Sequence, residues 1–101
     1  MATLLWLGGT ESDVEHRRLL VGLWRDRAGS LYAVSLGNTT TTLSVLTTRP
    51  DGQKIFTKDL IVTRCDKVIW GKGAKPFIGS ISEDRVTWRR EGTVFHWTRL
   101  Q

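Results

Sequence analysis

The sequence predicts an all-β domain, an antiparallel meander of about eight short strands with a short helical turn near the N-terminus. From residue 19 onward, short runs rich in Val, Ile, Thr, Trp and Phe are separated every eight to twelve residues by turn-forming residues, a pattern typical of all-β folds. The connections are short, so neighbouring strands should pair antiparallel. We expect the sheet to close into a small barrel or to fold into two packed sheets, since strand edges must be removed or protected.

One stretch carries a helix-start signal. Ser12 can cap a helix, and Glu15 stands three residues later, as in a capping box. We therefore predict at most two helical turns, within residues 11–18. The chain has 101 residues, the length of one domain. We expect residues 1–18 to form an N-terminal strand and short helix packed on the core, and residues 19–101 to form the all-β part.

The predicted strands lie between turn-forming segments. In one of these, Arg49-Pro50-Asp51-Gly52, proline takes the second position, which a type I turn favours. The approximate strand ranges are 19–25, 30–36, 41–48, 54–63, 67–71, 76–81, 85–90 and 93–100.

The last hairpin can be predicted residue by residue. If Glu91-Gly92 is the loop, Trp88 opposes Phe95, and side chains alternate between the two faces of the sheet. The core face then carries Val86, Trp88, Phe95 and Trp97. The opposite face carries Arg85, Thr87, Arg89, Val94, His96 and Thr98. Trp24 precedes a similar charged turn and is also expected in the core.

Basic residues are concentrated in the second half of the chain. The formal net charge is +5, and residues 54–101 carry the whole excess. A basic half of this kind attracts polyanions, and arginine binds phosphate through a planar fork of donors. The predicted polyanion-binding residues are Arg85, Arg89, Arg90, His96, Lys72 and Lys75, with Trp6 as a candidate ring for stacking on bases.

The sequence offers little for catalysis or metal binding. His16, His96 and Cys65 are the only residues of their types, and no motif combines them into a nucleophilic triad or a structural zinc site. We therefore expect no enzyme activity, no metal and no cofactor. A single cysteine favours a reducing compartment, so an intracellular and cytoplasmic location is expected. The N-terminal apolar run is too short for a signal peptide or a transmembrane segment.

Two resemblances add to these expectations. Gly22-Leu23-Trp24 on the first strand and Arg99 near the end of the last strand resemble the G-x-W and closing-arginine pattern of lipocalin-like calycin barrels. That resemblance implies a cupped site for a small apolar ligand. The segment from Trp88 to Arg99 is also similar to a tryptophan-rich β repeat of predicted dinoflagellate proteins, which implies a domain type but no chemistry.

The function that the sequence favours is a non-enzymatic binding module for a polyanion such as nucleic acid, through a basic strand face. Two alternatives remain open at this point. One is a protein-interaction or self-assembly module that uses an exposed sheet edge or Trp6. The other is a small calycin-like barrel that binds an apolar ligand.

Overall fold

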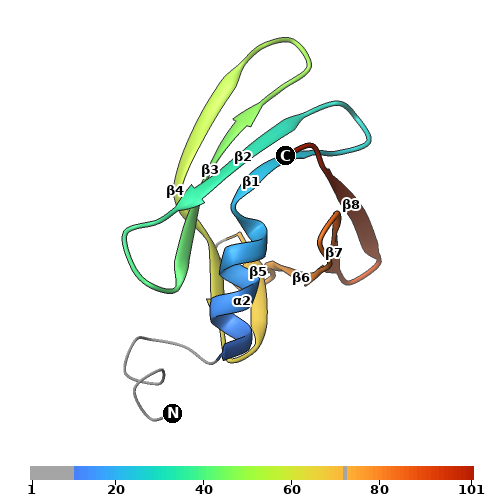
Figure 1. The fold of residues 1–101 in the computed structure, drawn as a ribbon. Coiled ribbons are helices and arrows are strands. Elements are labelled where there is room, and N and C mark those ends of the chain that lie inside the picture. Colours follow the sequence, from blue (N-terminus) through green and yellow to red (C-terminus); the bar gives the residue numbers. More distant parts are fainter. Residues whose placement is uncertain (1–10, 72) are drawn as a thin grey trace.

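The computed structural model describes residues 11–71 and 73–101, which form one helix and eight strands (Figure 1). The elements are α2 (Glu11–Leu20), β1 (Gly22–Arg25), β2 (Leu31–Leu36), β3 (Thr42–Thr48), β4 (Lys54–Arg64), β5 (Lys67–Trp70), β6 (Phe77–Ile81), β7 (Arg85–Arg90) and β8 (Thr93–Arg99).

The strands form a closed antiparallel barrel. Each strand pairs with the next along the chain, and β1 closes the circle by pairing with β8. In that closing pair, Trp24 lies opposite Arg99 and Arg25 lies opposite Thr98. The predicted all-β meander is therefore confirmed, and of the two expected arrangements the chain adopts the barrel.

Aromatic side chains fill the barrel. Trp24, Trp88 and Trp97 are completely buried, and the ring of Tyr32 stacks on that of Trp97 with 4.4 Å between their centroids. Gly79 faces the ring of Trp88, and a Cβ atom there would lie 2.7 Å from it. The β7–β8 register has Trp88 opposite Phe95. This confirms the hairpin predicted from the sequence.

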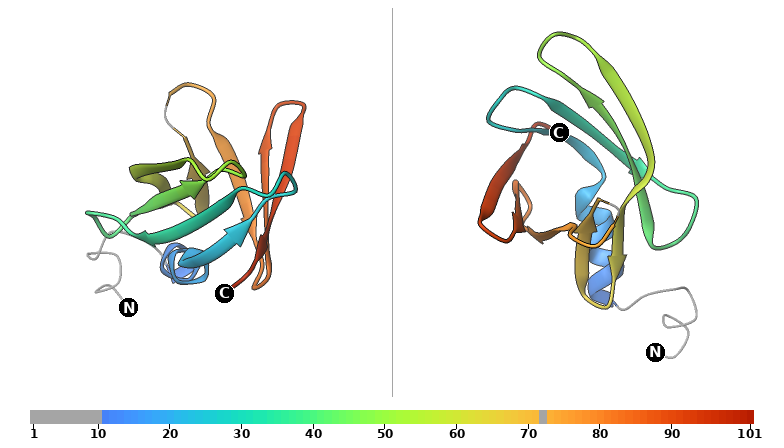
Figure 2. Two further views of the ribbon diagram at one scale, coloured as in Figure 1. Left: turned by 90° about the horizontal axis from the view of Figure 1, so that it is seen from above. Right: turned by 180° about the vertical axis from the view of Figure 1, so that it is seen from behind.

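The helix α2 packs at one end of the barrel, against β4, β5 and β6. Leu20 is completely buried, and its carbonyl accepts a hydrogen bond of 2.8 Å from Trp24 Nε1. At the start of the helix, the Asp13 carboxylate accepts a hydrogen bond of 2.8 Å from the backbone N–H of Asp66, in the β4–β5 turn. The tip of the β3–β4 hairpin projects at the opposite end of the molecule (Figures 1 and 2).

The helix is longer than predicted, and the first strand is shorter. The helix includes Ser12, which was expected to cap it, and runs on to Leu20, so β1 begins at Gly22 instead of residue 19. Tertiary contacts explain the difference, because the carbonyls of Leu19 and Val21 accept hydrogen bonds from Arg99 on the last strand. Among the described residues, no helix has the length and apolar character needed to cross a membrane.

Arg99 joins the last strand to the first strand and the helix. Its guanidinium lies over the ring of Trp24, 4.2 Å from the centroid, a cation–π contact. It also donates hydrogen bonds to the carbonyls of Leu19, Val21, Glu83 and Gln101. Gly22 leaves room for this arrangement, since a Cβ atom there would lie 2.7 Å from Arg99 Nη1.

Replacing Trp88 by alanine should lower the free energy of unfolding by about 3–5 kcal/mol, because it leaves a cavity among packed rings. Chemical denaturation followed by circular dichroism measures the change. An unchanged denaturation midpoint would contradict the assignment of Trp88 to the core.

Arg99→Lys should lower the free energy of unfolding by about 2 kcal/mol, because an ammonium cannot both stack on Trp24 and reach all four carbonyls. Arg89→Lys, on the exposed face of β7, is the matched control and should leave stability nearly unchanged. Equal denaturation midpoints for the two variants would show that Arg99 does not hold the barrel closed.

Candidate polyanion-binding surface

The outer face of β7 and β8 carries three of the predicted binding residues. Trp88 and Trp97 point into the barrel, so strand alternation turns Arg89 and His96 outward, and Arg85 lies on the same outer face. All three are exposed. The imidazole of His96 is held by a hydrogen bond of 3.0 Å between Nδ1 and the hydroxyl of Thr87.

Barrel closure brings a further arginine to this surface. Thr98 on β8 pairs with Arg85 on one side and with Arg25 of β1 on the other. The two arginines therefore flank one strand, with roughly 10 Å between their backbones, while Arg85 and Arg89 are roughly 13 Å apart along β7. We call Arg25, Arg85, Arg89 and His96 the basic face.

The arginines of the basic face are not neutralised by neighbouring acids. The ion pairs within residues 11–71 and 73–101 are Arg18–Glu15 and Lys75–Glu91, and neither involves this face. The face therefore presents three exposed arginines that form no ion pair with a described carboxylate.

A hollow of about 390 Å³ borders the basic face at the β1–β2 turn. Its acid, Asp26, is occupied by other groups, because its carboxylate accepts hydrogen bonds from the hydroxyl of Tyr32 at 2.6 Å and from the N–H of Ser30 at 2.9 Å. The lining residues are Arg25, Asp26, Arg27, Ala28, Gly29, His96 and Thr98. The hollow therefore combines two arginines, a hydroxyl and an imidazole with one carboxylate, whose oxygens accept hydrogen bonds from Tyr32 and Ser30.

Tyr32 supports the hollow from inside the barrel. Burial raises the pKa of its phenol to about 12, and the hydrogen bond to Asp26 acts in the same direction. The phenol therefore stays a donor to Asp26 throughout the neutral range, which keeps the β1–β2 turn in place.

The structure separates the other predicted binding residues from the basic face. Arg90 follows the inward alternation of β7, and its guanidinium lies over the ring of Phe77, 4.3 Å from the centroid. Lys75 forms an ion pair of 3.2 Å with Glu91. Lys72 and Trp6 lie outside the described residues.

Arg25 and Arg27 were missing from the sequence-based prediction, although a signal was present. Arg25 follows Trp24 as Arg89 follows Trp88, and if each tryptophan is inward, the next residue must point outward. Only the closing pair of β1 with β8, however, places Arg25 beside Arg85.

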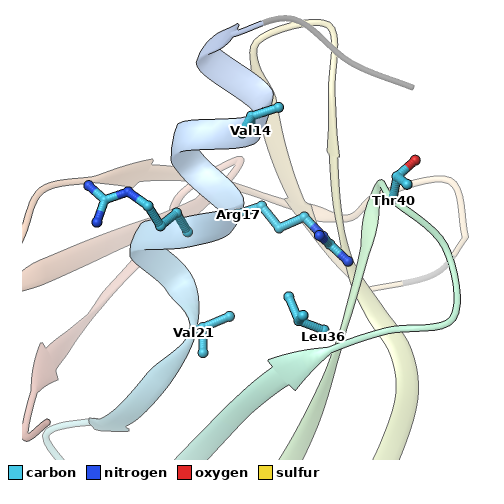
Figure 3. A pocket seen from close by; sticks show the side chains of 6 residues that line it. Val14, Arg17, Val21, Leu36 and Thr40 are labelled. Carbon is cyan, nitrogen blue, oxygen red and sulfur yellow. The ribbon is translucent and has the colours of Figure 1, made fainter. Parts of the chain in front are cut away.

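A second, more apolar groove lies between α2 and the β2–β3 turn (Figure 3). It has a volume of about 530 Å³ and is lined by Val14, Arg17, Arg18, Val21, Leu36 and Thr40. Arg17 reaches from the helix toward the turn, and its Nη2 donates a hydrogen bond of 3.1 Å to the carbonyl of Thr39. No described residue lines both this groove and the hollow at the β1–β2 turn.

The part of the chain that the structure describes holds no group of three or more His, Cys, Asp or Glu side chains placed to bind a metal ion. Cys65 is exposed and free, in the turn between β4 and β5. The guanidinium groups and the imidazole of the basic face can donate hydrogen bonds to an anion.

The fold and the surface together define a small antiparallel β-barrel protein with an arginine-bearing outer face. Comparisons with known protein families, with curated proteins and with solved structures found no match to this chain. The functional assignment therefore depends on the residues described above.

Tyr32 is the only tyrosine of the chain, so its ionisation can be followed by tyrosinate absorbance. The midpoint should lie near pH 12 in the folded protein, against about 10 in an unfolded chain. Because the unfolded state loses this proton first, the contribution to stability is complete below about pH 10 and is lost as the pH rises toward 12.

Asp26→Asn is the control for this titration. It should lower the midpoint, because the phenol then no longer faces a carboxylate. A midpoint near 10 in wild-type protein that is still folded by circular dichroism would contradict the buried hydrogen bond.

Proposed function

We propose that this protein is a non-enzymatic binding module for a polyanion, namely the phosphate backbone of a nucleic acid, and that it binds through the basic face. The observation that carries the proposal is the placement of Arg25, Arg85 and Arg89 on one exposed face, with no ion pair to a described carboxylate.

The arrangement suits phosphates spaced along a backbone. Each guanidinium can give two parallel hydrogen bonds to one phosphate, and the three arginines are spread over distances of roughly 10–13 Å. The hollow at the β1–β2 turn is the seat for one phosphate, with Arg25 and Arg27 as its cations and the hydroxyl of Thr98 as a further donor. Such contacts position a backbone without reading bases, so little sequence preference is expected.

The proposal is tested with the variant Arg25→Ala/Arg85→Ala/Arg89→Ala. Wild-type protein should bind a labelled oligonucleotide with an affinity that falls steeply between about 50 and 200 mM salt, because each neutralised phosphate releases counterions. The variant should bind more weakly, and the slope of log affinity against log salt should shrink by about one for each arginine removed.

The matched control is Lys58→Ala/Arg64→Ala/Lys67→Ala, which removes the same charge from exposed positions on β4 and β5. It should lose much less affinity than the first variant. If the two variants lost the same affinity, net charge alone would explain the effect, and the assignment of the basic face as the binding surface would be wrong. Binding to phosphatidylserine vesicles but not to oligonucleotide would overturn nucleic acid as the ligand.

A further inference from the structure

The strand β4 has a partner on both sides over only part of its length. Residues Ile61 to Arg64 pair with β5, and one further hydrogen bond of 3.3 Å runs from the N–H of Gly71 to the carbonyl of Leu60. Residues 54–58 have no described strand on the side away from β3, and residues 54–57 of this stretch pair with β3. We call this stretch the free edge, and it forms the outer margin of the projecting hairpin in Figure 1.

Backbone groups of the free edge point toward solvent. Arg49 N–H donates to the carbonyl of Gln53 at 2.8 Å across the hairpin turn, so these two residues form a hydrogen-bonded pair. In an antiparallel ladder such pairs alternate with pairs that are not hydrogen bonded. The N–H and C=O groups of Lys54 and Phe56 therefore point away from β3.

An apolar row across the sheet ends at this edge. Strand pairing aligns Leu23, Ala33, Leu46 and Phe56 on the outer face of β1, β2, β3 and β4. Phe56, the last member, is 62% exposed, and Ile55 on the opposite face is 38% exposed. A strand added beside β4 would bury both side chains and would satisfy the outward backbone groups, as in β-strand addition.

The positive charges at the free edge favour a partner that carries acidic residues. Lys54 lies on the same outer face as Phe56, and strand alternation assigns Lys58 to that face as well. Both lysines are exposed and form no ion pair with a described carboxylate. Two copies of the chain paired antiparallel about Phe56 would place Lys54 of one copy opposite Lys58 of the other. Lysines at sheet edges oppose such self-pairing, whereas acidic residues opposite them would be favourable.

We propose that the free edge of β4 binds an extended peptide segment in which two acidic residues flank an apolar residue on one face of the added strand. The apolar residue lies beside Phe56, and the acids lie opposite Lys54 and Lys58. This site lies on a part of the barrel separate from the basic face. Its test is therefore independent of the test of nucleic-acid binding.

The test is a titration of the full chain, labelled with ¹⁵N, with a capped peptide of sequence Thr-Glu-Val-Phe-Val-Glu-Thr. Amide exchange at Lys54 and Phe56 should slow markedly on binding, because their N–H groups become bonded. Exchange at Ile55 and Thr57, which already pair with β3, should change little. A second peptide with lysine in place of both glutamates should bind about tenfold more weakly, since like charges then face each other.

The charge-reversed variant Lys54→Glu/Lys58→Glu should exchange these preferences and bind the lysine peptide more tightly than the glutamate peptide. The matched control Arg64→Glu/Lys67→Glu, at the opposite end of β4, has the same net charge and should keep the wild-type preference. Slowed exchange at the edge amides without peptide, increasing with protein concentration, would assign the edge to a second copy and overturn the proposal. Unchanged exchange at Lys54 and Phe56 at millimolar peptide would also overturn it.

Discussion

The contact between Arg99 and Trp24 is the interaction on which the rest of the structure depends. It ties the last strand to the first strand and, through the carbonyls of Leu19 and Val21, to the end of the helix. A guanidinium can do this because it combines a flat face for stacking with donors in several directions. Without closure at this point, Arg25 would not lie beside Arg85, and the basic face would be divided between two open edges.

The sequence was most informative where structure is local. The two-residue loop Glu91-Gly92 set the register of β7 and β8, and alternation then placed Trp88 and Trp97 inside and Arg89 outside. The end of the helix could not be predicted in this way. The carbonyl of Leu19 accepts a hydrogen bond from Arg99, 80 residues away, and such a tertiary partner overrides local strand propensity.

Part of the candidate surface was predictable because it lies within one local hairpin. Arg85, Arg89 and His96 follow from alternation within one hairpin. Arg90 was grouped with them by charge alone, yet its position in β7 turns it toward Phe77. The contribution of Arg25 depends on the pairing of β1 with β8, which carries no local sequence signal. The distribution of charge therefore identified the half of the chain that contains most of the candidate surface. The strand pairing determined which arginines lie together on one face.

Asp59 marks the point where β4 changes from a barrel strand to the projecting hairpin. Its φ is 53°, the register of β3 and β4 shifts beside it, and such a bulge bends a strand. The Asp59 carboxylate accepts hydrogen bonds from the N–H of Asn38 and the hydroxyl of Thr42, which lower its pKa. Because β4 bends at this bulge, residues 61–64 can pair with β5 while residues 54–58 lie away from it.

The long separation between Leu19 and Arg99, 80 residues along the sequence, has a consequence for how the protein is made. During synthesis, α2 and β1 leave the ribosome well before the arginine that binds their carbonyls and covers Trp24. Until β8 has emerged, the ring of Trp24 and the side chain of Leu20 lack their final neighbours, and such exposed apolar surface is prone to aggregate. Contacts between distant residues also slow folding, so we expect the closing contact of Arg99 to form after the local hairpins.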